Sequence, residues 1–142
     1  MAAAIAPILI ALASFVLRLV NLGSTKGYIF DEVYYVDGAR DLLKYGVEVS
    51  GSNPEFIVHP PVGKWLIGGG IAIFGDNEFG WRFATALIGT LLILVFARLV
   101  HVLFYSPVLT GLGAALMALD GLLLVHSRTA LLDLFLTFFI LI

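Results

Sequence analysis

The sequence contains no cysteine, which excludes disulfide bonds and metal sites built on thiolates. Charged residues are also scarce, at 13% of the 142 residues, whereas soluble domains contain about 25%. There is no block of Lys or Arg and the formal net charge is −2, so the chain lacks the electrostatic pattern of a nucleic-acid-binding protein. The remaining composition is apolar, with 61% hydrophobic residues and a mean hydropathy of +1.05. It predicts an integral membrane protein.

The few charges are concentrated in one part of the sequence. Thirteen of the 18 charged residues lie between Lys26 and Arg82, and eight of those thirteen are acidic. The sequence on either side of this segment is apolar. We therefore expect a polar segment placed between membrane spans.

Four apolar runs are expected to enter the membrane, at residues 2–22, 79–104, 108–125 and 129–142. A spanning helix needs about 20 apolar residues, and the last run has only 14, so the fourth span is expected to be incomplete. Ala11-Leu12-Ala13 resembles a signal-peptide cleavage site, but no Lys or Arg precedes it, which favours an uncleaved first span. Arg18, near the end of that span, is expected to extend to the membrane interface.

The polar segment, at about residues 23–78, is expected to form a large extracytoplasmic loop. Arg98 and His101 mark the far end of the second span as positive and hence cytoplasmic. Within the loop, residues 31–45 have the spacing of an amphipathic helix, and residues 62–74 form an apolar run too short to span. The predicted fold class is an all-α integral membrane protein with juxtamembrane helices in its first loop.

Asp31 and Glu32 are adjacent carboxylates just beyond the first span. At a membrane surface, such a pair can supply a general base and an acceptor-binding group, because burial and a second carboxylate both raise a carboxyl pKa. The alternative is structural. Asp31 then caps the amphipathic helix and Glu32 stabilises the positive end of its dipole.

His59, Lys64 and Arg82 could bring positive charge to a lipid phosphate. A guanidinium holds a phosphate through two hydrogen bonds, and Arg82 stands at the start of the second span. The alternative is anchoring, in which Lys64 and Arg82 reach the headgroup region. His59 has no partner at metal-ligand spacing, so no metal site is expected.

Arg128 and Asp133 are further candidates for substrate binding. A carboxylate within a span is costly and implies a partner or a wet cavity. If the third and fourth spans form a hairpin, Asp120 and Asp133 lie at similar depth with Arg128 close above them. A structural ion pair among the three is the alternative.

Five motifs occur in a characteristic order: FDEVYY at 30–35, HPPVGK at 59–64, RF at 82–83 followed by LIGTL at 87–91, DGL at 120–122 and SRTALLD at 127–133. In this order they resemble the N-terminal region of the dolichyl- or polyprenyl-phosphate-mannose:protein mannosyltransferase family, particularly its bacterial members. The resemblance covers nearly the whole chain. Its specificity comes from the joint pattern, since no single motif is specific.

The resemblance implies the N-terminal portion of a GT-C-type membrane glycosyltransferase whose full-length members are several times longer. It implies a multi-pass protein of the cell membrane with its active site on the extracytoplasmic side. The implied reaction transfers mannose, with inversion, from a polyprenyl phosphate to a Ser or Thr hydroxyl of a translocated protein. By the same resemblance Asp31 is the base, Glu32 is associated with the acceptor and Arg82 with the lipid phosphate. No cofactor is expected.

Two other interpretations remain open. Enzymes that modify lipid A with aminoarabinose share the Asp/Glu and Pro-Pro pattern, with Lys more usual at the position of His59. A non-catalytic helix bundle, such as a transporter or assembly subunit, would instead use the carboxylates of the third and fourth spans and leave Asp31 and Glu32 as surface structure.

Overall fold

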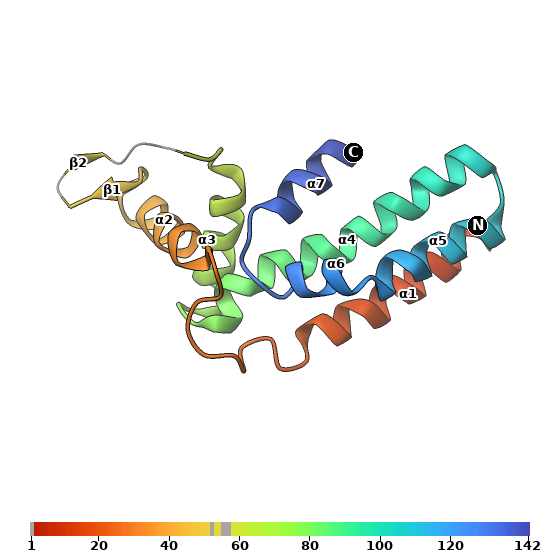
Figure 1. The fold of residues 1–142 in the computed structure, drawn as a ribbon, viewed down its shortest axis with the longest axis horizontal. Helices are drawn as coiled ribbons and strands as arrows, with labels where there is room; N and C mark the ends of the chain where they lie inside the picture. The colour runs from red at the N-terminus through yellow and green to blue at the C-terminus, as the bar shows by residue number, and fades with distance from the viewer. Residues whose placement is uncertain (1, 52, 55–57) are drawn as a thin grey trace.

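The computed structural model describes residues 2–51, 53–54 and 58–142, and in these ranges the chain is mainly helical (Figure 1). One short antiparallel hairpin, in which Val49 faces Pro54, accompanies the helices. The elements in chain order are α1 (Ala2–Leu19), α2 (Glu32–Tyr45), β1 (Val49–Ser50), β2 (Asn53–Pro54), α3 (Val62–Phe74), α4 (Glu78–Phe104), α5 (Pro107–Leu119), α6 (Gly121–His126) and α7 (Asp133–Leu141).

Helix α4 is the central helix of the fold. Helices α1, α3, α5, α6 and α7 all pack against it, and α2 packs on α3. The Asn77 side chain caps its start by accepting hydrogen bonds from the backbone N–H groups of Phe79 and Gly80. Among the described helices, α4 alone is both long and apolar enough to cross a membrane. This confirms the helix predicted at 79–104.

The two helices predicted in the polar segment are also confirmed. Helix α2 begins one residue after the predicted start at 31 and ends at Tyr45, followed by Gly46 in the left-handed conformation (φ 75°). Helix α3 occupies 62–74 as predicted.

The apolar run at 108–125 is divided between two helices. Helix α5 ends at Leu119, and Asp120 has an extended backbone (φ −63°, ψ 120°). Its carboxylate accepts a hydrogen bond of 2.6 Å from the backbone N–H of Leu123 and so caps α6. A short acidic side chain competes with the helical backbone in this way, which favours a helix start over a helix interior.

Two buried clusters hold the helices together. The larger lies where α2, α3, α4 and the segment around α7 meet, and it includes Val36, Ile67, Leu92 and Phe135. The smaller joins α1, α4 and α5 through Ala11, Ile93, Ala97 and Ala114. The small side chains of its three alanines allow the three helices, which run side by side in Figure 1, to approach closely.

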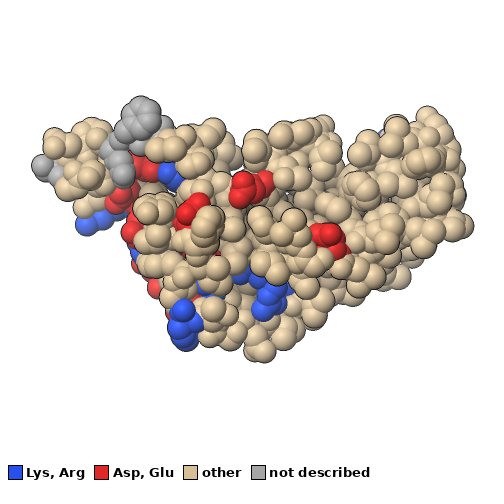
Figure 2. All heavy atoms as spheres, viewed as in Figure 1, with Lys and Arg blue, Asp and Glu red and all other residues tan. Residues whose placement is uncertain are grey.

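Large apolar side chains cover the outer faces of α1, α5, α6 and α7. Leu116, Leu122 and Ile140 are each at least 70% exposed. On the face shown in Figure 2, charged side chains gather toward the end of the molecule that carries α2, the hairpin and α3. Extended apolar surface of this kind is expected where lipid, rather than water, surrounds a protein.

Arg18 does not extend to an interface, so that prediction is wrong. Its side chain is completely buried, and Nε donates a 2.8 Å hydrogen bond to Oγ of Ser127, while Nη1 donates to the carbonyl and hydroxyl oxygens of Ser14. Gly89 lies beside this group, where a Cβ atom would collide with Ser127. Buried polar partners offset part of the cost of placing the guanidinium inside the bundle.

Helix α3 meets the start of α4 at a contact that only glycine permits. A Cβ atom at Gly70 would overlap the carbonyl oxygen of Gly80, whereas one at Gly69 would have no neighbour within 4 Å. We expect Gly70→Ala to lower the free energy of unfolding by about 1–3 kcal/mol through overpacking. The matched Gly69→Ala should leave it unchanged or raise it by about 0.5–1 kcal/mol, because alanine favours a helix. Thermal unfolding in detergent would show this; equal stabilities would contradict the close approach.

Candidate active site

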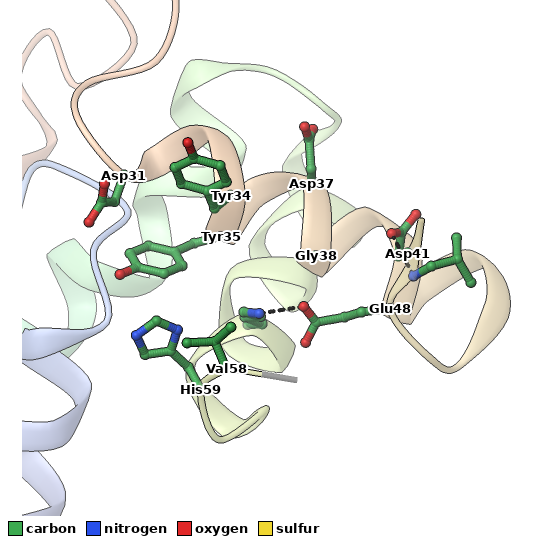
Figure 3. Close-up of a pocket in the computed structure, with 11 residues that line it drawn as sticks. Asp31, Tyr34, Tyr35, Asp37, Gly38, Asp41, Glu48, Val58 and His59 are labelled. Carbon is green, nitrogen blue, oxygen red and sulfur yellow. Dashed lines mark hydrogen bonds and ion pairs between the residues drawn. The ribbon is translucent and has the colours of Figure 1, made fainter. Parts of the chain in front are cut away.

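A cavity of about 490 Å³ lies between α2, the hairpin and the start of α3 (Figure 3). Most of the residues that line it are polar: Asp31, Tyr34, Tyr35, Asp37, Asp41, Glu48, His59 and Lys64. The predicted site residues Asp31, His59 and Lys64 are thus brought together from two separate parts of the sequence.

Asp31 stands at the start of α2 with its carboxylate at the wall of the cavity. The preceding residue, Phe30, has a left-handed backbone (φ 53°), which turns the chain sharply into the helix. The carbonyl of Asp31 accepts from the backbone N–H groups of Tyr34 and Tyr35, but its side chain forms no capping hydrogen bond. The capping role considered from the sequence therefore belongs to the backbone alone. The half-buried carboxylate remains available at the cavity wall.

Tyr35 and His59 face each other beside Asp31 (Figure 3). Their rings meet edge to face, with centroids 5.4 Å apart and planes at 85°. The pKa of Tyr35 is raised, first by burial and then by the negative charges of Asp31 and Asp133. Asp133 therefore lies close enough to Tyr35 to act on it. Its own position, at the start of α7, also borders a neighbouring apolar groove of about 340 Å³.

Glu32 points away from the cavity into the protein and is completely buried. Its Oε1 accepts from Nε of Arg82 (2.8 Å) and from the backbone N–H of Ala130 (2.7 Å). Its Oε2 accepts from Nη2 of Arg82 (2.7 Å) and from the backbone N–H of Ile29 (2.8 Å). Both carboxylate oxygens are thus occupied by two partners each.

Arg82 is equally enclosed, with only 1% of its surface exposed. Besides the two hydrogen bonds to Glu32, Nη1 donates to the carbonyls of Leu22 and Thr25, and Nη2 donates to that of Gly27. These partners engage all five N–H groups of a guanidinium. Neither Glu32 nor Arg82 lines the cavity, so their expected contacts with acceptor and phosphate remain predictions.

Lys64 is buried in an ion pair with Glu48. Sequence reasoning did not select Glu48, which belongs to no motif and is separated from Lys64 by the hairpin. Its position is fixed by Asp41, whose carboxylate accepts a 3.1 Å hydrogen bond from the backbone N–H of Val49. Only the fold reveals that these residues share one cavity.

Arg128 is placed outside this cavity. Its Nη1 donates hydrogen bonds of 3.0 Å to the carbonyls of both Leu17 and Arg18, at the end of α1. Within the described ranges, it forms no ion pair with Asp120 or Asp133, so the structural alternative considered for the three is not seen. A role for Arg128 in substrate binding stays a prediction.

A second cluster joins α2 to the turn between α3 and α4. Arg40 donates two hydrogen bonds of 2.8 Å to Asp76 and one to Asp37, and its guanidinium lies over the rings of Tyr28 and Trp81. Hydrogen bonding to Asp76 raises the pKa of Arg40 above its already high value, so the charge persists at any working pH.

Comparison with known proteins gives consistent matches. Residues 58–142 match the family model described as dolichyl-phosphate-mannose-protein mannosyltransferase. A polyprenol-phosphate-mannose–protein mannosyltransferase of Mycobacterium tuberculosis is 46% identical over 138 residues, which are 93% of this chain and 26% of that protein. The protein of the same name from Corynebacterium glutamicum is 37% identical over 141 residues, 93% of this chain and 27% of that protein.

A more distant relative has another printed activity. An undecaprenyl phosphate-alpha-4-amino-4-deoxy-L-arabinose arabinosyl transferase of Pseudomonas fluorescens is 36% identical over 91 residues, 63% of this chain and 17% of that protein. The chain spans about a quarter of the length of the mannosyltransferases that it matches. No solved structure gave a significant match.

The buried pair predicts a stability effect. Glu32→Gln should lower the free energy of unfolding by about 3–5 kcal/mol, because it leaves the buried Arg82 without a counter-charge. Glu78→Gln is the matched control, since Glu78 pairs with the exposed Lys26 at 3.5 Å and should change stability little. Thermal unfolding of both variants in detergent provides the measurement. Equal melting temperatures for Glu32→Gln and the wild type would contradict the interpretation.

The position of Tyr35 in the cavity wall predicts that its phenol titrates at an unusually high pH. The raised pKa means that Tyr35 favours its neutral form in the folded protein. The corresponding stability is fully present below the ordinary pKa of about 10 and is lost as the pH rises through the folded value. The ultraviolet titration curve of Tyr35→Phe, subtracted from that of the wild type, isolates the ionisation of Tyr35. This ionisation should occur at a higher pH than that of an ordinary tyrosine. In an Asp31→Asn background this phenol should titrate earlier; an unchanged curve would place Asp31 too far away to act on it.

Proposed function

The chain belongs to the dolichyl-phosphate-mannose-protein mannosyltransferase family, and on that basis we propose that it forms part of an enzyme active site. The proposed reaction transfers mannose from a polyprenyl phosphate to a Ser or Thr hydroxyl of a protein. The relatives' names supply the donor and acceptor classes. The observation that carries the proposal is the Asp31 carboxylate, which is not used as a helix cap and lies at the wall of the cavity beside Tyr35 and His59.

The chemistry needs a base because a Ser or Thr hydroxyl is a weak nucleophile. The hydroxyl oxygen bonds to C1 of mannose while the bond from C1 to the phosphate oxygen breaks, and its electron pair leaves with the polyprenyl phosphate. Asp31 takes the hydroxyl proton as the new bond forms. Attack opposite the leaving phosphate inverts the configuration at C1. General-base catalysis of this kind is typically worth about 10²–10⁴-fold.

The leaving phosphate needs a hydrogen-bond donor or a positive charge. His59 is placed for this role, since it lines the cavity next to Asp31 and Tyr35. Lys64 adds positive charge nearby, although its ammonium is paired with Glu48. Arg82 acts as a positioning residue in this proposal, because it fixes Glu32 and through it the start of α2 that carries Asp31.

We place the cavity on the extracytoplasmic side of the cell membrane, within the N-terminal portion of a GT-C-type fold. The cavity is built from α2, the hairpin and α3, which lie in the expected extracytoplasmic loop. Acceptor proteins would then meet Asp31 as they are translocated. Transfer of aminoarabinose from the same class of lipid phosphate is the alternative, favoured by the relative from Pseudomonas fluorescens.

Asp31→Asn should reduce transfer by at least about a hundredfold, because asparagine keeps the shape of the side chain but does not accept a proton near neutral pH. The assay uses membranes from cells producing the complete protein, with labelled polyprenyl-phosphate-mannose and a Ser/Thr-rich peptide. Asp120→Asn is the matched control, since Asp120 also starts a helix but lies outside the cavity. Its activity should match the wild type.

Two outcomes would contradict the proposal. Retention of more than about a tenth of the wild-type rate by Asp31→Asn would remove this residue as the base. Transfer of aminoarabinose but not mannose by the wild type would shift the function to the alternative donor.

A further inference from the structure

Glu48 carries a buried carboxylate that is only half satisfied. The residue is 6% exposed, and its Oε2 accepts a hydrogen bond from Nζ of Lys64. Its Oε1 has no hydrogen-bond partner among the residues that the structure describes. A buried acceptor without a partner loses its hydration and gains no hydrogen bond in return, and such groups are usually kept for a reason. Because Glu48 lines the cavity, a bound molecule can supply the missing donor.

The Glu48–Lys64 pair is held rigidly. Asp41 binds the backbone N–H of Val49 and so fixes the residue that follows Glu48. On the other side the pair packs against Gly38 of α2, where an added Cβ would lie 2.9 Å from Oε2 of Glu48 and 3.1 Å from Cδ of Lys64. A recognition group that is fixed in advance loses little entropy when a ligand binds.

The charge of the pair indicates the class of ligand. The carboxylate and the ammonium neutralise each other, so the pair does not favour an anion or a cation strongly. It still offers an unused acceptor at Glu48 Oε1, and an ammonium has three N–H groups, of which Glu48 takes one. Adjacent acceptor and donor groups match neighbouring hydroxyls, each of which can both donate and accept. A polyhydroxyl ring is the ligand with this chemistry.

We propose that Glu48 and Lys64 form the subsite for the sugar hydroxyls of the donor. Oε1 of Glu48 accepts from one ring hydroxyl, and Nζ of Lys64 donates to its neighbour. This inference rests on the proposed function and deepens it by assigning the sugar-recognition residues. In Figure 3, Glu48 lies toward one end of the cavity and Asp31 and His59 lie toward the other. The ring therefore binds at Glu48 with C1 directed toward Asp31.

The acceptor is a second possible source of hydroxyl groups, but it fits this subsite less well. A Ser or Thr side chain offers one hydroxyl, and that hydroxyl is the nucleophile, which must lie within hydrogen-bond reach of Asp31. The pair of adjacent groups at Glu48 and Lys64 calls for two hydroxyls away from the reacting atom. We therefore assign the subsite to the sugar of the donor.

Glu48→Asp tests the assignment. Aspartate keeps the negative charge beside Lys64, so the ion pair is retained, but it draws both oxygens back by one methylene. Glu78→Asp is the matched control, because Glu78 also pairs with a lysine but lies outside the cavity. In the complete protein, Glu48→Asp should raise the donor KM by roughly 10- to 100-fold. The acceptor KM and inhibition by sugar-free polyprenyl phosphate should stay unchanged, and Glu78→Asp should behave as the wild type.

A second measurement changes the donor. Among donors in which single hydroxyls of the mannose are replaced by hydrogen, at least one should lose tenfold or more in kcat/KM with the wild type. The same donor should lose less with Glu48→Asp, because the contact is already weakened. If Glu48→Asp proves too unstable to assay, the absence of any such loss with the wild type still overturns the subsite.

The outcomes separate this inference from the function on which it rests. If the wild type transfers mannose but no deoxygenated donor loses activity, or if Glu48→Asp raises the acceptor KM instead of the donor KM, the sugar subsite is overturned and the function stands. If the wild type transfers no mannose, the proposed function is overturned, and the mannose subsite with it.

Discussion

The buried pair of Glu32 and Arg82 is the interaction on which the rest of the site depends. It connects the start of α2, the loop after α1, the first turns of α4 and the backbone at Ala130. A buried ion pair is favourable only when its remaining donors and acceptors are also satisfied. Here both carboxylate oxygens and all five guanidinium N–H groups have partners, so the start of α2 is fixed in one position. The cavity wall that carries Asp31 follows from that constraint.

The neighbouring carboxylates of Asp31 and Glu32 thereby lie in different environments. Successive residues of a helix point about 100° apart, so when Glu32 faces the protein interior, Asp31 faces elsewhere. Glu32 accepts four hydrogen bonds inside the protein, while the Asp31 side chain caps no backbone group and lies at the cavity. The left-handed turn at Phe30 sets this rotation. The chemistry of the pair is therefore decided by orientation, since the two side chains carry the same functional group.

The sequence predicted the elements better than the contacts. Periodicity and length located α2, α3 and α4, because apolar spacing and turn residues act locally. The sequence did not show that a new helix starts at Asp120, since an acid inside an apolar run gives no sign of whether it starts a helix or sits within one. The burial of Arg18 and the pairing of Glu48 with Lys64 could not be predicted from the sequence either. Both contacts join segments that the fold brings together, and the spacing of residues along the chain does not show which distant segments will meet.

The close contact between Gly70 and Gly80 has a mechanical consequence. It fastens α3, and with it Lys64, to the same end of α4 to which Arg82 fastens α2. Both walls of the cavity are thus mounted on one end of the longest helix. Membrane helices adjust their tilt to the local thickness of the bilayer. When the tilt of α4 changes, both walls move with it. The distance between the two walls therefore does not depend on the thickness of the surrounding bilayer.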